Sequence, residues 1–301
     1  MQSNKQEQRI KLMETSEIIK KVRKVEIKTR GLSQNIFAGQ YHSAFKGRGM
    51  AFSEVREYQY GDDVRDIDWN VTARFHHPYI KVFEEERELT VMLLVDVSGS
   101  LDFGTIHQTK RDMVTEIAAT LAFSAIQNND KIGVIFFSDK IEKYILPKKG
   151  RKHILYIIRE LLDFKPQSRR TDIGMAVSYL TRMMKRRCTA FLLSDFYTRD
   201  DFYKEMQIAN SKHDMIAIQV YDQRAKMLPD IGLMKVRDAE TGHEMIIDTS
   251  SAKFRHAHTA YWLEREEDLR RLFAMSNVDW TSIATNEDFA KALMLLFKKR
   301  A

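Results

Sequence analysis

Cysteine is nearly absent from this sequence, since Cys188 is the single one among 301 residues. One thiol excludes an internal disulfide framework, and this scarcity is typical of proteins that work in a reducing compartment. Cys188 opens the apolar run 188–193, so we interpret it as a small core residue rather than a nucleophile. The four prolines and twelve glycines are too few for long flexible linkers.

Long hydrophobic runs are missing as well. No stretch reaches the roughly 18 to 20 apolar residues that a membrane-spanning helix needs. The first ten residues, MQSNKQEQRI, lack the apolar core of a signal peptide. With 44% hydrophobic and 30% charged residues, the chain can still build a packed core. We therefore expect a cytoplasmic protein.

The net charge of +7 is unevenly distributed. Residues 1–50 carry 11 Lys or Arg against 4 Asp or Glu, whereas residues 51–90 carry 5 against 10. A basic arm, residues 1–44 with a helix over 10–29, therefore precedes an acidic block. Such an arm can dock on that block, contact nucleic acid, or hold the protein at the periphery of the inner membrane.

From residue 89 onward, short apolar runs alternate with amphipathic segments. Buried strands are predicted over 89–95, 131–137, 188–194, 215–221 and 278–283, with an edge strand over 141–146 and a hairpin over 231–248. Helices are predicted over 105–127, 152–164, 171–185, 201–211, 253–275 and 286–299, the last capped by Asn286. This order predicts an α/β fold with a doubly wound, mostly parallel, Rossmann-like sheet over 89–301. Before it, residues 45–88 are expected to form a small module of strands and turns.

Oxygen-bearing side chains follow several of these strands. Asp96, Ser98 and Ser100 come after the first strand, Thr171 precedes a helix, and Asp195 follows the strand 188–194. Ligands of parallel sheets bind beyond the carboxyl ends of the strands. Carboxylate and hydroxyl oxygens without His or Cys suit a hard cation, Mg²⁺ above Mn²⁺ or Ca²⁺. A simpler interpretation is that these residues only cap helices.

The pattern Asp-x-Ser-x-Ser, a later Thr and a later Asp resembles the metal-ion-dependent adhesion site of von Willebrand factor A-type domains. The resemblance implies that Asp96, Ser98, Ser100 and Thr171 contact the ion directly or through water, and that Asp195 acts mainly through water. It also implies that an acidic side chain of a protein partner completes the metal shell.

A second resemblance involves the string from Gly49 to Arg87. Its core, REYQYGDDVRDIDWN (residues 56–70), is similar to the signature of the bacterial family called domain of unknown function 58. Members carry a von Willebrand-type domain after this string and typically accompany a MoxR-type AAA+ ATPase. The mixed charges either lock the module onto its neighbour or form part of a partner-docking surface, for which the candidates are Arg56, Asp62, Asp63, Arg65, Asp68, Trp69 and Arg74.

Several enzymatic interpretations fit less well. A P-loop needs a lysine where Thr105 stands, and a phosphatase of the haloacid dehalogenase type needs an Asp where Ser98 stands. Ser98 also lacks the Gly-x-Ser-x-Gly elbow of a hydrolase nucleophile. The serious rival is a divalent-metal-dependent nuclease or nucleic-acid-binding protein that uses the acidic cluster and the basic arm. The arm lacks the interleaved aromatics of a stacking platform.

The sequence thus predicts a non-catalytic adaptor. It would bind a divalent cation and a protein partner, and would work with a MoxR-type ATPase in chaperone-like assembly or remodelling.

Overall fold

The structure is a computed structural model that describes residues 51–84, 89–105, 108–198 and 200–300. The predicted helix over 10–29 and the rest of the basic arm lie outside the described residues. Two compact units are present, one within residues 46–89 and the other within residues 90–301. No helix in the described ranges is both long and apolar enough to cross a bilayer.

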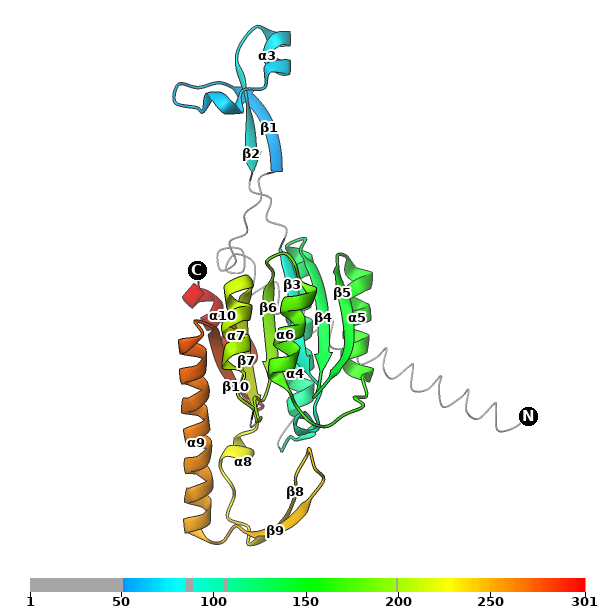
Figure 1. Ribbon diagram of the computed structural model, residues 1–301, viewed down its shortest axis with the longest axis vertical. Helices are drawn as coiled ribbons and strands as arrows, with labels where there is room; N and C mark the ends of the chain where they lie inside the picture. Colours follow the sequence, from blue (N-terminus) through cyan, green and yellow to red (C-terminus); the bar gives the residue numbers. More distant parts are fainter. Residues whose placement is uncertain (1–50, 85–88, 106–107, 199, 301) are drawn as a thin grey trace, which may run out of the picture. The chain divides into compact units, whose positions relative to one another are not determined.

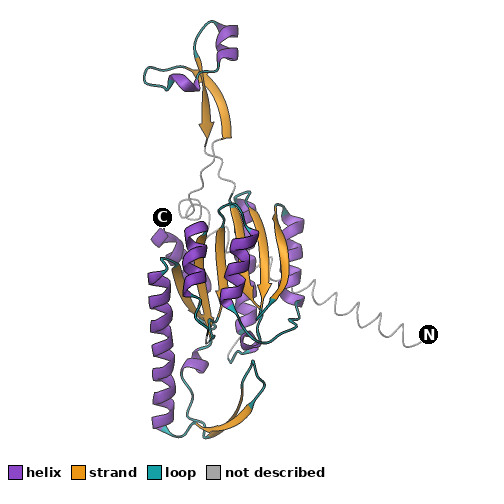
Figure 2. Cartoon of the chain, viewed as in Figure 1, coloured by secondary structure: helices purple, strands orange, loops and turns teal. Residues whose placement is uncertain are grey.

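The small unit is a two-stranded antiparallel ribbon with a helical excursion (Figures 1 and 2). Strands β1 (Ala51–Glu57) and β2 (Tyr79–Glu84) enclose the 3-10 turn η1 (Val64–Asp66) and helix α3 (Trp69–Phe75). We expected only strands and turns here, and α3 corrects that. The Asp68 carboxylate caps α3 by accepting from the backbone N–H groups of Asn70 and Val71, which outweighs the weak helix propensity of the segment.

The large unit is built on one six-stranded sheet. Its strand order is β10-β7-β6-β3-β4-β5. Every neighbouring pair is parallel except β4 with β5, which is antiparallel. The bounds are β3 Thr90–Asp96, β4 Lys131–Phe137, β5 Ile141–Lys148, β6 Thr189–Ser194, β7 Asp214–Tyr221 and β10 Asp279–Ala284. The predicted mostly parallel sheet is confirmed, with β5 as its edge strand.

Helices cover both faces of this sheet (Figure 1). Their bounds are α4 Lys110–Gln127, α5 Arg151–Asp163, α6 Ile173–Met183, α7 Tyr203–Lys212, α9 Ala252–Met275 and α10 Phe289–Arg300. The short elements η2 (Gly99–Asp102) and α8 (Gln223–Lys226) follow β3 and β7. Outside the sheet, β8 (Leu233–Arg237) and β9 (Glu244–Asp248) form the predicted hairpin.

Alternate residues of the central strands enter two apolar layers. On one face, Met92 and Leu94 of β3 pack in a buried cluster with residues of α6, α7 and α9. On the other face, Phe191 of β6 meets Phe297 of α10 edge to face, with ring centroids 6.3 Å apart. Burial on both faces explains why these strands read as continuous apolar runs, and the doubly wound arrangement is confirmed.

Two helix starts differ from the prediction by three residues or more. Helix α4 begins at Lys110 rather than Thr105, because the Thr109 hydroxyl caps it in a reciprocal pair with Asp112. Helix α10 begins at Phe289, and Asn286 does not cap it, since its side-chain amide donates to Gln223 instead. Both errors came from extending an apolar period across a polar loop.

A buried histidine makes the stability of the large unit sensitive to acid. His213 is fully buried, and its Nε2 atom has no hydrogen-bond partner among the described residues. Burial, with the positive charges of Lys212 and Arg187, lowers the pKa of His213 from 6.5 to about 4. The neutral ring therefore contributes stability that is fully present above pH 6.5 and is lost as the pH falls toward the folded-state pKa.

We expect His213 alone to lower the free energy of unfolding by about 2 to 3 kcal/mol when the pH falls from about 7 to about 4.5. Urea unfolding at the two pH values measures the loss. Leucine is similar in volume to histidine but does not titrate. The unfolding free energy of His213→Leu should therefore fall by about 2 to 3 kcal/mol less than that of the wild type over the same pH interval. Parallel pH profiles for the two proteins would contradict the assignment.

Candidate functional site

The loop after β3 gathers three buried oxygen-bearing side chains. Asp96, Ser98 and Ser100 are 1%, 0% and 7% exposed. The Asp96 carboxylate accepts a hydrogen bond from the Ser98 backbone N–H at 2.8 Å. The Ser98 and Ser100 hydroxyl oxygens lie 3.0 Å apart. The tight turn of η2 thus aims alternate side chains at one point, as the spacing predicted.

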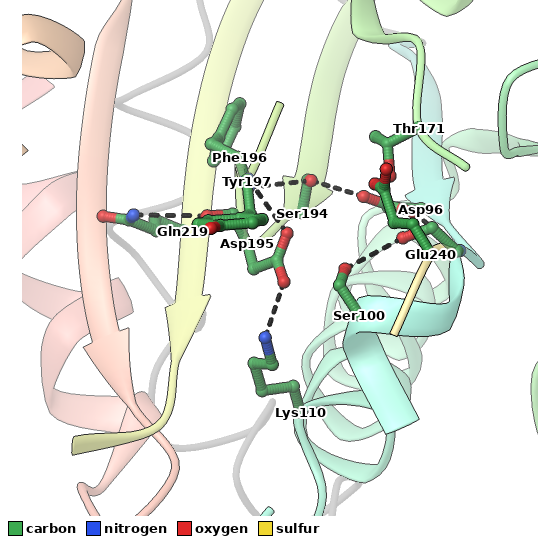
Figure 3. A network of polar contacts seen from close by, with 11 residues as sticks. Asp96, Ser100, Lys110, Thr171, Ser194, Asp195, Phe196, Tyr197, Gln219 and Glu240 are labelled. Atoms are coloured by element: carbon green, nitrogen blue, oxygen red, sulfur yellow. Dashed lines mark hydrogen bonds and ion pairs between the residues drawn. The ribbon is translucent and has the colours of Figure 1, made fainter. Parts of the chain in front are cut away.

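The two other predicted residues reach the same edge of the sheet. Thr171 lies in the loop before α6 and is buried, and Asp195, at 3% exposed, directly follows β6. The Ser100 hydroxyl helps to hold the pKa of Asp195 below its ordinary value, so the two side chains are neighbours. Strand pairing accounts for this meeting, because β3 and β6 are parallel neighbours and their carboxyl ends coincide. Figure 3 shows Asp96, Ser100, Thr171 and Asp195 around one centre.

Three further residues belong to this site although we did not predict them. The Ser194 hydroxyl donates to the second carboxylate oxygen of Asp96 at 2.5 Å. The Lys110 ammonium lies 2.6 Å from Asp195 Oδ2, in a pair whose side chains are 8% and 2% exposed. The Thr171 hydroxyl donates to Glu240 Oε1 at 3.2 Å. Ser194 is adjacent to a predicted ligand, but no local pattern connects Lys110 or Glu240 with Asp96.

The two aspartates differ in their electrostatic surroundings. Burial, together with the charge of Asp195, raises the pKa of Asp96 from 3.8 to about 6. Burial acts in the same direction on Asp195, but Lys110 outweighs it and holds the pKa of Asp195 below its ordinary value. Hydroxyl and N–H groups therefore solvate the charge of this buried carboxylate. No cationic side chain in the described part of the chain pairs with Asp96 at close range.

The carboxylate and hydroxyl oxygens of this site fit a small, hard cation. Octahedral Mg²⁺ has ligand distances of about 2.1 Å, so adjacent ligands lie about 3 Å apart, whereas Ca²⁺ needs a wider spacing. The Ser98 and Ser100 hydroxyls already have the shorter spacing. No three His, Cys, Asp or Glu side chains of the described residues converge closely enough to hold a metal by themselves. A cation here would thus depend on Asp96, the hydroxyls of Ser98, Ser100 and Thr171, and water.

The carboxyl end of β7 carries a different kind of carboxylate. Asp222 is 1% exposed and accepts hydrogen bonds from Thr105, Thr285 and Arg224. These contacts fasten the loops after β3 and β10 to the end of β7, so Asp222 stabilises the fold. Cys188 is also structural, because it is 3% exposed and burial raises the pKa of its thiol to about 12. That pKa keeps the thiol protonated and inert.

The charged residues of the small unit form ion pairs within that unit. Arg56 makes two hydrogen bonds of 2.8 Å to the carboxylate of Asp62, and Arg65 lies 2.9 Å from Asp63. The Arg56 contact holds the pKa of Asp62 below its ordinary value. Asp68 caps α3 and lies 3.6 Å from Lys81, while Trp69 and Arg74 are exposed. Most of these carboxylates are thus already paired with cations.

Comparison with known proteins connects the chain to several relatives. The family model described as "Protein of unknown function DUF58" matches residues 54–268. An uncharacterized protein of Mycobacterium bovis is 32% identical over 223 residues, which cover 73% of this chain and 70% of that protein.

Two solved structures are similar in fold. An aerotolerance-related membrane protein from Bacteroides fragilis covers 70% of this chain and 99% of its own, with a TM-score of 0.49 and 14% identity. The SpRpn10 VWA domain covers 70% of this chain and 95% of its own, with a TM-score of 0.40 and 11% identity.

Proposed function

This chain belongs to the family described as "Protein of unknown function DUF58", and we propose that it is a cation-dependent protein-interaction module. In this proposal a divalent cation, Mg²⁺ before Mn²⁺ or Ca²⁺, binds at Asp96, Ser98, Ser100, Thr171 and Asp195. An acidic side chain of a partner protein then contacts the cation. The observation that carries the proposal is the buried Asp96 carboxylate beside two hydroxyls at the spacing of adjacent octahedral ligands.

The charge of the ligand set favours binding over catalysis. Lys110 already neutralises Asp195, so among the five proposed ligands only Asp96 opposes the two positive charges of the ion. A desolvated cation with surplus charge attracts an anionic ligand strongly. The hydroxyls do not act as bases at neutral pH, and the nearest carboxylates are engaged by Ser194, Ser98, Lys110 and Tyr197. We therefore propose no catalytic residue.

We further propose a MoxR-type AAA+ ATPase as the partner, working with this chain in assembly or remodelling of client proteins. The resemblance of the signature string motivates this choice. The small unit adds support, because its large apolar side chains Tyr60, Val64, Trp69 and Phe75 are 105%, 60%, 68% and 60% exposed. Exposed aromatics beside ordered ion pairs are typical of docking surfaces. The proposed location is cytoplasmic, with the basic arm able to contact an anionic membrane.

Metal removal tests the interaction directly. Immobilised chain is expected to retain the purified, nucleotide-free ATPase in Mg²⁺, to release it in excess EDTA, and to recapture it when Mg²⁺ is restored. Omitting nucleotide matters because the ATPase would otherwise respond to Mg²⁺ through its own site. Retention that survives EDTA would refute a cation-mediated contact.

A nuclease assay separates the proposal from its enzymatic rival. The purified chain with Mg²⁺ or Mn²⁺ is expected to leave single- and double-stranded DNA and RNA intact. Cleavage that disappears in Asp96→Asn would replace the interaction proposal by a hydrolytic one.

A further inference from the structure

The tip of the β8–β9 hairpin reaches into the site. Glu240 lies in the connection between the two strands, half-buried, and accepts the hydrogen bond from Thr171. In Figure 3 its side chain lies beside Asp96 and Thr171, although it comes from a segment about 70 residues further along the chain. Thr171 is one of the proposed ligands, so Glu240 contacts the proposed cation site from outside the sheet.

The tip is held by local hydrogen bonds and is closely packed where it carries Glu240. Asp238 Oδ1 accepts from the backbone N–H groups of Glu240 and Thr241 and from the Thr241 hydroxyl, and Gly242 adopts a positive φ of 74°. On the site side, a Cβ atom added to Gly99 would lie 2.6 Å from the carbonyl oxygen of Ala239. The hairpin tip and the Ser98–Ser100 loop therefore touch through their backbones.

The body of the hairpin, by contrast, is loosely attached. Leu233, Met245 and Ile246 are 75%, 52% and 71% exposed. Moving the hairpin would uncover little apolar surface, since its strands bury little to begin with. Contacts at the tip, rather than a shared core, hold Glu240 at the site.

Charge balance assigns Glu240 a role. Asp96, Asp195 and Glu240 contribute three negative charges and Lys110 one positive charge, so the ionised set carries −2, which a divalent cation neutralises. Without Glu240 the same cation leaves a surplus of +1. Arg170 and Asp238 also act electrostatically on Glu240, with opposite signs, and leave this balance unchanged.

We propose that Glu240 is an internal ligand of the cation, and that it holds the coordination position which an acidic side chain of the partner takes when the hairpin moves away. This inference rests on the proposed cation site and adds a residue that the Asp-x-Ser-x-Ser pattern does not contain. It makes partner binding a replacement of one carboxylate by another, with the hairpin as the element displaced.

Bound Mn²⁺ shows whether Glu240 or water occupies the coordination position. The paramagnetic ion relaxes the protons of the water molecules that it coordinates, so each added water raises the water-proton relaxivity. We expect Glu240→Gln to weaken Mn²⁺ binding about 10-fold, by electron paramagnetic resonance titration. We also expect higher water-proton relaxivity per bound ion, since water fills the position that Glu240 leaves. The matched control is Glu244→Gln, which removes an exposed charge of the same hairpin that pairs with Lys235, and it should behave as wild type.

Two further measurements make the assignment specific. Gly99→Ala keeps every proposed ligand but forces its new Cβ against Ala239, so it should displace the tip and raise relaxivity as Glu240→Gln does. Millimolar acetate, a stand-in for the partner's carboxylate, should lower relaxivity again in Glu240→Gln but not in the wild type.

The outcomes separate this inference from the site on which it rests. Unchanged affinity and relaxivity in Glu240→Gln, with Mn²⁺ bound by the wild type, would overturn the role of Glu240 and leave the cation site standing. A wild type that binds no Mn²⁺ would overturn the proposed function and this inference together.

Discussion

Asp96→Asn is expected to weaken Mg²⁺ binding by at least about 100-fold and to abolish cation-dependent retention of the partner. Replacing a residue that merely orients a metal ligand already costs about 10- to 100-fold in affinity. No cationic side chain of the described residues pairs with Asp96, so its replacement removes an anionic ligand whose charge is not already neutralised. Isothermal titration with Mg²⁺ measures the loss.

The fold should survive this change. Asparagine keeps an oxygen that can accept from the Ser98 N–H, and its amide N–H can donate to the Ser194 hydroxyl oxygen once that hydroxyl hydrogen turns away. It also removes a desolvated charge, which is costly in the metal-free protein. We therefore expect metal-free Asp96→Asn to unfold at a denaturant concentration no lower than the wild type.

Saturating Mg²⁺ should raise the unfolding temperature of the wild type but not of the variant, because only a ligand that binds the native state stabilises it. Equal shifts in the two proteins would place the cation elsewhere.

The central strands could be predicted from the sequence because burial on both faces leaves an unambiguous mark. The segments 89–95 and 131–137 are continuous apolar runs, and β3 and β4 follow them within one residue. Helix α3 left no such mark, since none of its residues is buried. Its existence depends on the Asp68 cap, a local hydrogen bond that a hydrophobic period cannot reveal.

Some residues of the site could likewise be predicted from the sequence and others could not. Asp96, Ser98 and Ser100 share one turn, so their convergence follows from chain geometry. Asp195 could be added because strand order brings the carboxyl ends of β3 and β6 together. Thr171 lies in the loop before α6, which backbone hydrogen bonds from Gly99 to Arg169 and from Asp172 to Ser138 hold at the same edge. Glu240 depends on where a hairpin outside the sheet packs, which no pattern within the hairpin specifies. The cation ligation of all these residues stays a prediction.

The role of Lys110 could not be predicted from the sequence for a further reason. It occupies the first turn of α4, where a positive charge opposes the helix dipole, so local rules favour a different residue. Its position makes sense only through Asp195, 85 residues away. Lys110 stands against its local helix preference and is buried with the opposite charge of Asp195. This placement indicates that the ion pair itself matters for the site.

Lys110→Met is accordingly expected to destabilise the metal-free protein by about 3 to 5 kcal/mol. Methionine matches the length of the buried lysine stem, but it leaves the Asp195 carboxylate buried without its counter-charge, and breaking a buried pair has about this cost. Urea unfolding at neutral pH in EDTA measures the loss. The double variant Lys110→Met with Asp195→Asn should recover most of it, because neither charge then remains buried alone.

The same variant should bind Mg²⁺ more tightly than the wild type. Removing Lys110 changes the charge of the ionised set from −2 to −3, and a more negative, water-poor site attracts a divalent cation more strongly. Stability and cation affinity are thus expected to move in opposite directions, which general damage to the fold would not produce. The control Lys110→Arg keeps the positive charge and should show no gain in affinity. If Lys110→Met lowered both quantities, Lys110 would be a structural support of the site rather than the charge that limits cation binding.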